Sequence, residues 1–220
     1  MLILSVTDLH GTNSVPLTAR NDFESADLVV LTGDLTTFGD ERRAEQTLRI
    51  FQALNPNVVA VPGNCDTPAV NEFLRSKGVN LHGETREISG LTFLGLGGSL
   101  PAPGGTAMEF TEAELGRILH QAAARLAKPP PPFVLVSHQP PRNTTCDRIA
   151  SGRHVGSTSV RSFIQSHLPL LCLTGHIHDA AGIDAIESTR IANPGPFHTG
   201  AYARAIIESG RLTHLEIRRP

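Results

Sequence analysis

Five short polar segments carry the side chains of this 220-residue chain that could do chemistry. Together they supply two aspartates, one asparagine and four histidines, which are Asp8, His10, Asp34, Asn64, His138, His176 and His178. Carboxylate and amide oxygens combined with imidazole nitrogens suit the divalent ions of manganese, iron, zinc and nickel. The set therefore predicts a metal site.

The spacing within the segments supports this interpretation. Asp8 and His10 are two residues apart at the end of an apolar run, as are His176 and His178, so the side chains of each pair should point the same way. Asp34 follows a glycine, and we assign it as a bridging carboxylate, because two dications about 3.5–4 Å apart repel unless an anion lies between them. Any one of these segments alone would be more typical of a turn or a surface position.

Each polar segment directly follows a short run rich in Val, Ile and Leu, at 2–6, 28–32, 58–61, 133–137 and 170–174. These runs alternate with amphipathic stretches at 41–54 and 111–126, which predict helices and an α/β chain. Ligands of α/β sheets bind beyond the carboxyl ends of the strands. The five segments are therefore expected to converge at one edge.

The alternation of predicted strands and helices ends after His178. The runs 182–187, 190–192, 201–208 and 211–217 are separated by tight turns and are expected to belong to an antiparallel sheet. A further hairpin is predicted at 84–95 around Ser89-Gly90, and the proline tract 129–132 is expected to be a stiff connection into a strand. Two sheets flanked by helices, in one domain over residues 1–220, account for the whole chain.

Bulk properties narrow the range of partners. The formal charge is −2, and the 19 basic residues are scattered, which predicts no footprint for non-specific nucleic-acid binding. No apolar run approaches the roughly 20 residues of a membrane span, and no leader peptide precedes the first strand, so we expect a cytoplasmic protein without a membrane partner. Three cysteines at no zinc-ribbon spacing predict no disulfide. The surplus of strands near the carboxyl end could pair across a homo-oligomer interface.

The ordered set Asp-x-His, Gly-Asp, Gly-Asn-x-Asp, His and Gly-His-x-His, from Asp8 to His178, resembles the calcineurin-like metallophosphoesterase superfamily. The resemblance implies a four-layer αββα sandwich of two mixed β-sheets with a dinuclear centre at the strand carboxyl ends. One ion would be held by Asp8, His10, Asp34 and His178, and the other by Asp34, Asn64, His138 and His176. Two manganese ions are the first choice, with iron, zinc or nickel as alternatives. Asn193-Pro194-Gly195 also resembles a turn that many small members carry.

The expected chemistry is phosphoester hydrolysis. Two cations that share a water lower its pKa from near 16 toward neutrality and so supply a hydroxide for attack on phosphorus, with Asp34 and Asn64 at the catalytic centre. The substrate would be a small-molecule or nucleotide phosphoester. A nucleotide or protein phosphomonoesterase is the alternative within the enzymes, and a non-catalytic interaction scaffold is the alternative of another class.

One position departs from the family pattern. Many members have a histidine after the asparagine ligand, and this chain has Cys65, which we expect at the substrate. A thiol is a poor general acid and a weak hydrogen-bond donor. Small members of the family with a cysteine at this position are often phosphodiesterases, so the resemblance favours diesters over simple alkyl monoesters. The polar stretch 139–157 is a candidate substrate loop in which His154 could replace the missing proton donor, and Arg142 or Arg153 could clamp a phosphoryl oxygen. The alternative is a solvated loop whose end starts a helix at 158–165.

The remaining candidates receive structural interpretations. Asp66 could orient a neighbouring group, but Asp66-Thr67-Pro68 favours a helix N-cap followed by proline in the first turn. Five further histidines have no ligand partner at useful spacing and are interpreted as structural or surface residues, namely His82, His120, His167, His198 and His214. Of these, His198 is the least settled, because it follows the Asn-Pro-Gly turn.

Overall fold

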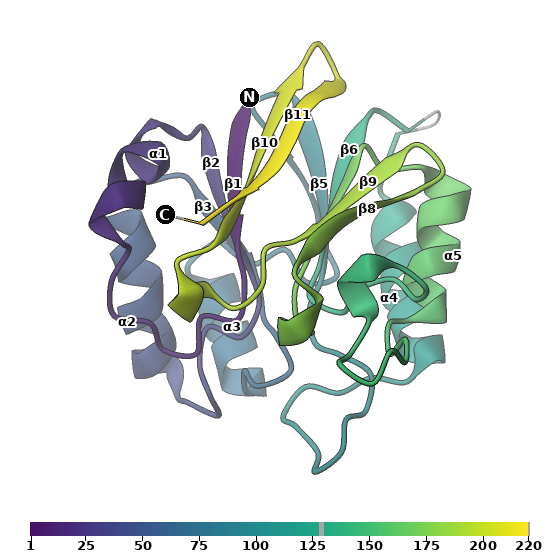
Figure 1. The fold of residues 1–220 in the computed structure, drawn as a ribbon, viewed down its shortest axis with the longest axis horizontal. Helices are drawn as coiled ribbons and strands as arrows, with labels where there is room; N and C mark the ends of the chain where they lie inside the picture. Colours follow the sequence, from purple (N-terminus) through teal and green to yellow (C-terminus); the bar gives the residue numbers. More distant parts are fainter. Residues whose placement is uncertain (128–129, 220) are drawn as a thin grey trace.

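A computed structural model describes residues 1–127 and 130–219 of the chain. Two β-sheets lie face to face and helices cover the outer face of each, so the layers follow the order α, β, β, α (Figure 1). This is the four-layer sandwich of mixed sheets expected from the sequence. Among the described residues, no helix combines the length and the apolar character that crossing a membrane would require.

The first sheet has five strands in the order β11-β10-β1-β2-β3. Its parallel part consists of β1 (Leu2–Val6), β2 (Leu28–Thr32) and β3 (Val58–Val61). The hairpin of β10 (Tyr202–Glu208) and β11 (Arg211–Arg218) extends it, with β10 antiparallel to β1.

The second sheet has six strands in the order β4-β5-β6-β7-β9-β8. Its four central strands run parallel and are β5 (Leu91–Leu96), β6 (Phe133–Ser137), β7 (Leu171–Thr174) and β9 (Thr189–Asn193). The antiparallel edge strands are β4 (Thr85–Ile88) and β8 (Gly182–Ile186).

The expectation of one antiparallel sheet after His178 was wrong. The last four strands form two hairpins that join different sheets, and β9 runs parallel to β7. Tight turns specify each hairpin locally, whereas the sheet that a hairpin joins depends on contacts between distant segments. The hairpin around Ser89-Gly90 is present as predicted.

Three helices pack on the first sheet and two on the second (Figure 1). The first group contains α1 (Arg20–Ser25), α2 (Glu41–Gln52) and α3 (Pro68–Ser76), and the second contains α4 (Glu112–Ala123) and α5 (Thr158–His167). Four short 3-10 turns lie at Leu17–Ala19, Thr145–Asp147, His178–Ala180 and Phe197–Thr199. Of the proline tract expected to be a stiff connection, Pro129 lies outside the described residues.

Alternation along the central strands builds the layers. In β1, Ile3 faces the apolar cluster between the sheets, and Leu4 faces the cluster under the helices. In β6, Val134 faces the cluster between the sheets and Leu135 the cluster under α4 and α5. Strands buried on both faces read as continuous apolar runs. The rigid sandwich that results holds the strand ends, and therefore the polar segments, in place.

Candidate metal centre

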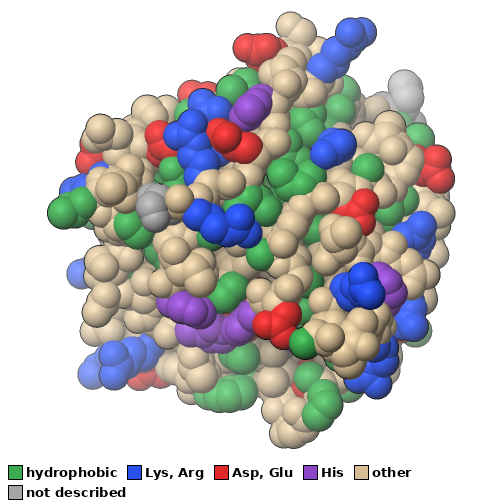
Figure 2. Space-filling model, in the orientation of Figure 1, with side chains coloured by type: hydrophobic (Ala, Val, Ile, Leu, Met, Phe, Trp, Pro, Cys, Tyr) green, Lys and Arg blue, Asp and Glu red, His purple; other side chains and the backbone are tan. Residues whose placement is uncertain are grey.

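The five polar segments do converge, at the carboxyl ends of β1, β2, β3, β6 and β7. Backbone hydrogen bonds tie neighbouring segments together within each sheet. His10 N donates to Asp34 O at 2.8 Å, and Gly175 N donates to His138 O at 3.2 Å. A row of histidine side chains lies on the face of the molecule at this edge (Figure 2).

One group of donor atoms comes from Asp8, His10 and His178, which lie close enough to share an ion. Asp8 Oδ1 is 3.3 Å from His178 Nε2, and His178 Nε2 is 3.4 Å from His10 Nε2. Asp8 is buried, while His10 and His178 are partly exposed. The group therefore combines a deep carboxylate with two imidazoles that solvent or a substrate can approach.

A second group comes from Asn64, His138 and His176. His138 Nε2 is 3.0 Å from Asn64 Oδ1, and the centres of the His138 and His176 rings are 5.3 Å apart. His138 is fully buried and Asn64 is 4 % exposed. Asn64 and His138 therefore lie deeper than His10 and His178.

Asp34 lies between the two groups. Its Oδ2 is 3.8 Å from His10 Nε2, and its Oδ1 is 3.6 Å from His138 Nε2. The backbone N–H of Cys65 donates to Oδ1 at 2.8 Å and fixes the carboxylate. One oxygen thus faces each group, which is the placement that the bridging role requires.

The donor chemistry fits a pair of divalent cations. His138 Nδ1 lies 2.8 Å from the Thr32 carbonyl, which can only accept, so Nδ1 carries a proton and Nε2 faces Asn64 Oδ1 at 3.0 Å. With a neutral imidazole, these two atoms would both offer electron pairs to a cation. Asp8 Oδ1 is buried without a hydrogen-bond partner in the described part of the chain, although His178 Nε2 is close. Buried charged oxygens are normally paired or coordinate metal.

The backbone at this edge is unusual in conformation. Four of the predicted ligands, Asp8, His10, Asp34 and His176, have φ between 48° and 67°. A non-glycine residue in this region costs of order 1 kcal/mol, and such residues cluster at functional sites. The left-handed residues turn the chain sharply after each strand and aim the ligands inward.

Two glycines let the segments approach this closely. A Cβ at Gly63 would collide with the carboxylate and the backbone nitrogen of Asp34, and one at Gly175 would collide with the Thr7 side chain and approach Asp8 Oδ2. Any side chain at either position would collide with these atoms, so both positions require glycine.

Electrostatics keep Asp8 and His176 in the forms that bind metal. Burial alone would raise the pKa of Asp8, but the neighbouring His178 and His138 outweigh it and hold that pKa below its usual value. Burial, together with His138, lowers the pKa of His176 to about 3. Asp8 is therefore a carboxylate and His176 a neutral imidazole at neutral pH.

Asp66 is not the helix cap predicted from the sequence. The cap of α3 is Thr67, whose side chain accepts from Val70 N. Asp66 is fully buried and accepts from the backbone N–H groups of Leu35, Thr36 and Gly63. Two of these residues flank Asp34 and Asn64 in sequence, so Asp66 orients the two loops that carry those ligands.

Cys65 lies at the candidate metal centre. Its sulfur, His10 and Asp34 form a third group of closely spaced donor atoms. Burial, followed by the charge of Asp34, strongly raises the pKa of the Cys65 thiol. The side chain is therefore a neutral thiol beside the ligands.

The predicted substrate loop is more ordered than its composition suggests. Asp147 is fully buried and accepts from the backbone N–H groups of Asn143, Thr144 and Gly156, and His154 Nδ1 lies 2.6 Å from its Oδ1. The end of the loop starts α5, with Ser157 as its cap, as the alternative interpretation expected. Asp147 was missed, although Thr144 and Asp147 have capping-box spacing that could have revealed it.

The substrate candidates of this loop differ in their placement. Arg153 helps line a pocket that His176 borders. The backbone of Arg142 pairs with that of Ser157, and its carbonyl accepts from Arg161. Neither Arg142 nor His154 is among the residues lining the three pockets described next.

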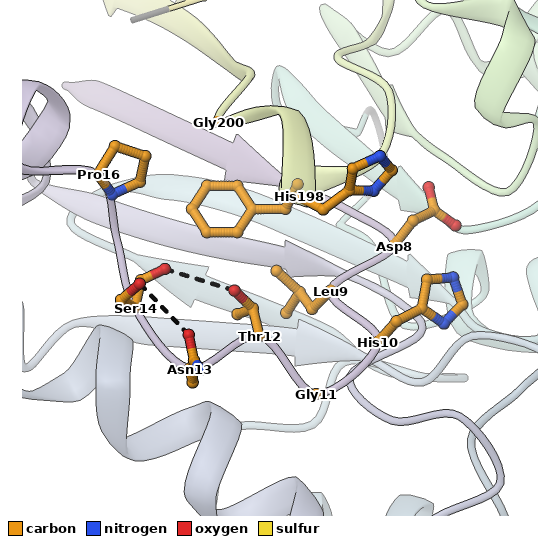
Figure 3. Close-up of a pocket in the computed structure, with 11 residues that line it drawn as sticks. Asp8, Leu9, His10, Gly11, Thr12, Asn13, Ser14, Pro16, His198 and Gly200 are labelled. Atoms are coloured by element: carbon orange, nitrogen blue, oxygen red, sulfur yellow. Dashed lines mark hydrogen bonds between the residues drawn. The ribbon is translucent and has the colours of Figure 1, made fainter.

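Three pockets border the ligand cluster; the smallest, of about 210 Å³, is lined by His10, Thr36, Thr37 and Arg43 among others, and two are larger. The first, of about 430 Å³, is lined by Asp8 and His10, by residues 11–14 and Pro16, and by Phe197, His198 and Gly200 (Figure 3). The second, of about 290 Å³, has His176 and Arg153 in its lining together with apolar side chains such as Leu100 and Ile149. Each half of the ligand cluster therefore has its own pocket.

A four-layer sandwich with clustered Asp, Asn and His side chains at the strand carboxyl ends defines a class of metal-dependent phosphoester hydrolases. The family model of the calcineurin-like phosphoesterases matches residues 1–180, and the chain belongs to that family. The family implies a dimetal phosphoester hydrolase, and the donor groups described above supply candidate ligands for both ions.

Similar proteins extend over nearly the whole chain. The uncharacterized protein MJ1162 of Methanocaldococcus jannaschii is 36% identical over 200 residues, which are 89% of this chain and 88% of that protein. The crystal structure of TT1561 of Thermus thermophilus has a TM-score of 0.72 at 21% identity and covers 99% of this chain and 98% of its own. A dimetal phosphatase from Danio rerio has a TM-score of 0.59 at 15% identity, covering 95% of this chain and 93% of its own. The last two likenesses concern the fold.

Proposed function

We propose that the protein is a phosphodiesterase that uses two divalent ions, with manganese as the first choice of metal. One ion would be held by Asp8, His10, Asp34 and His178, and the other by Asp34, Asn64, His138 and His176. The substrate is a small-molecule or nucleotide phosphodiester.

The observation that carries the preference for a diester is the pair of larger pockets. A phosphodiester has two organic groups on phosphorus, whereas a monoester has one. One pocket borders Asp8 and His10 and the other borders His176, so a phosphorus atom at the ligand cluster has room for an organic group on either side. Arg153 in the second pocket could contact an oxygen of the substrate.

Cys65 supports the same preference. A monoester carries more negative charge than a diester, and its alkoxide leaves poorly without a proton donor. The Cys65 thiol has a raised pKa and is a weak donor, so the position used by a histidine in many relatives contributes little here. Small members of the family with a cysteine at this position are often phosphodiesterases, and this resemblance favours diesters.

When bound, a pair of cations supplies an activated water and neutralises charge on the phosphoryl oxygens. The residues of the chain position the reaction around it. Asp34 is held by the Cys65 N–H, and the Thr32 carbonyl fixes the His138 ring so that Nε2 faces the site. The fixed geometry means that little reorganisation is needed when the substrate binds.

The cellular compartment and the oligomeric state are inferred from other features of the chain. All three cysteines, Cys65, Cys146 and Cys172, are free thiols, which favours a reducing compartment, and we propose the cytoplasm. The edge strands β8 and β11 offer unpaired backbone groups, through which a second copy could form a homo-oligomer.

The test is hydrolysis of a nitrophenyl diester beside the matching monoester. Chelator-stripped protein is titrated with Mn²⁺, and an Asp34→Asn variant is assayed in parallel. Metal-dependent turnover that favours the diester and is lost in the variant is expected. A preference for the monoester would favour the phosphomonoesterase alternative. Absence of metal binding would favour the non-catalytic scaffold.

A further inference from the structure

The turn after β9 brings an unassigned histidine to the metal centre. Phe197 N donates to the carbonyls of Thr7 and Asp8, at 3.1 and 3.4 Å, and Pro196 pairs with Thr7 as an isolated β-bridge. The turn ends at Gly200, which has a φ of 79° and donates to the Phe197 carbonyl. His198 thus directly follows a residue whose backbone is hydrogen-bonded to that of the candidate ligand Asp8.

The hydrogen bonds that fix the turn do not use the His198 side chain, which can therefore contact a ligand. Backbone groups and the Thr199 hydroxyl, which donates to the Pro196 carbonyl at 2.8 Å, make the hydrogen bonds that fix the turn. His198 is exposed and lines the first pocket beside Asp8 and His10. Figure 3 shows its ring on the same side of the pocket as the Asp8 carboxylate and the His10 ring.

The rest of this pocket identifies the kind of group it would accept. Across from the three ionisable residues lie Thr12, Asn13, Ser14 and Pro16 (Figure 3). The Ser14 hydroxyl contacts the Asn13 side chain, and the Thr12 hydroxyl donates to the Ser14 carbonyl. This wall offers neutral hydrogen-bonding groups and no lysine or arginine. It suits a neutral polar alcohol and does not suit a second anionic group.

The other candidate proton donors are less suitable. The Cys65 thiol has a raised pKa. His154 Nδ1 is engaged by the buried Asp147, and His154 lines neither of the two larger pockets, although its neighbours Arg153 and Val155 line the second. Among the residues that line the first pocket, His198 is the imidazole that is not a predicted metal ligand.

We propose that the first pocket receives the leaving alcohol of the phosphodiester and that His198 protonates the leaving oxygen. This assignment rests on the proposed function. The bond between phosphorus and the leaving oxygen breaks, and that oxygen takes a proton from His198. One water adds OH to phosphorus and releases a proton to solvent, from which His198 is recharged, so atoms and charge balance. His198 then takes the place of the histidine that Cys65 replaces.

The test compares two diesters that differ in their need for a proton donor. Nitrophenyl methyl phosphate has a leaving group that departs as an anion, and phenyl methyl phosphate has one that benefits from protonation. His198→Gln should lower kcat for the phenyl diester about 100-fold, as expected for loss of a general acid, and change kcat for the nitrophenyl diester less than about threefold. KM should change little for either substrate.

Two variants serve as matched controls. His214→Gln removes an exposed histidine on β11, where its ring lies 3.4 Å from Glu216, and should change neither rate. His154→Gln tests the competing donor and should not reproduce the dependence on the leaving group. Equal losses on both diesters in His198→Gln, no loss on either, or a selective loss in His154→Gln would each overturn the proposal.

If the protein is not a phosphodiesterase, the assays give a result that can be distinguished from failure of the His198 assignment. If the wild-type protein hydrolyses only monoesters, the same comparison with nitrophenyl phosphate and phenyl phosphate still decides the role of His198. A readout without turnover uses zinc-loaded protein and dimethyl phosphate, an inert diester. The imidazole resonances of His198, assigned by their loss in His198→Gln, should shift on saturation, and resonances that do not move would overturn the contact.

Discussion

The metal edge and the loop from residue 143 to residue 156 both contain buried carboxylates, but they satisfy them differently. In the loop, Asp147 is fully buried, and three backbone N–H groups and the His154 ring surround its oxygens. At the metal edge, Asp8 is 1 % exposed and has one oxygen without a hydrogen-bond partner among the described residues.

The difference separates a structural carboxylate from a ligand. A carboxylate whose oxygens all accept from N–H or O–H donors has no electron pair left for an ion. A buried carboxylate with a free oxygen can still bind a cation. Asp66 belongs to the first kind, although it is only two residues from the candidate ligand Asn64 and although burial, followed by the charge of Asp34, raises its pKa to about 6.

The sharpest way to test this comparison is Asp34→Asn. The variant should lose turnover by more than about 100-fold, because even residues that only orient metal ligands contribute about 10- to 100-fold. In metal-free protein, it should raise the free energy of unfolding by about 1 kcal/mol, since it removes a buried charge that also repels Asp66. Urea unfolding with chelator measures this change.

A core substitution supplies the control. Leu173→Ala in β7 creates a cavity in the cluster between the sheets and should lower the free energy of unfolding by about 2–5 kcal/mol. Turnover per folded molecule and the number of bound ions should remain near wild type. If Asp34→Asn destabilised the metal-free protein as Leu173→Ala does, Asp34 would be a structural carboxylate.

For Asp147→Ala, we expect the free energy of unfolding of the metal-free protein to fall, which is opposite to the change expected for Asp34→Asn. Asp147→Ala leaves the N–H groups of Asn143, Thr144 and Gly156 without their acceptor and should destabilise the metal-free protein by about 3 kcal/mol. Two ions should still bind, because Asp147 contacts none of the donor groups of the metal centre. Denaturant unfolding and metal titration of the same sample measure both quantities. A metal stoichiometry that fell with Asp147→Ala would connect the loop to the centre.

Sequence patterns could predict the strands at the site because each is buried on both faces. The apolar run predicted as a strand at 170–174 corresponds to β7 at Leu171–Thr174, and the run at 133–137 coincides with β6. The short helix α1 was missed because Phe23 is its only buried residue and no side chain caps it. A single apolar residue gives no helical period.

The structure brings the candidate ligands together, and they could be selected from the sequence because spacing and residue type are local properties. The two kinds of buried carboxylate could not be distinguished in this way. Asp66 was assigned as a cap because Asp-Thr-Pro fits a cap at either of its first two residues. The hydrogen bonds that Asp66 accepts from Leu35 and Thr36, in the loop after β2, exclude Asp66 as the cap. The position of His198 was equally invisible, since the backbone contacts that attach its turn to Thr7 and Asp8 span about 190 residues of sequence.

A buried histidine extends the comparison to groups that should stay neutral. His82 Nδ1 accepts from Gly97 N at 2.8 Å, and burial followed by the charge of Arg75 lowers its pKa to about 4. The folded-state pKa lies below the usual value of 6.5, so the stability from neutral His82 is present above pH 6.5 and is lost as the pH falls toward 4. The loss is at most about 3 kcal/mol.

This pH dependence is measured as a difference. Urea unfolding of the wild type and of His82→Gln between pH 4 and pH 7 separates His82 from the carboxylates that titrate in the same range. The gap in unfolding free energy between the two proteins should narrow as the pH falls. A gap independent of pH would show that His82 titrates normally in the folded protein.

The smallest expected effect concerns Cys65, which lies in sequence between the ligand Asn64 and the structural Asp66. Its backbone N–H holds Asp34, and its thiol borders the donor atoms of His10 and Asp34. Cys65→His keeps the backbone contact and adds an imidazole that can donate to a leaving oxygen. We expect monoester turnover to rise about tenfold relative to diester turnover. This is a small effect for an added general acid, because the proposed donor His198 already serves diesters.

Steady-state rates with the nitrophenyl diester and monoester, at equal metal occupancy, measure the ratio. Cys65→Ser is the matched control, since it replaces the thiol with a small hydroxyl and should leave the ratio near wild type. An unchanged ratio in Cys65→His would mean that this residue does not set the preference between the two ester classes.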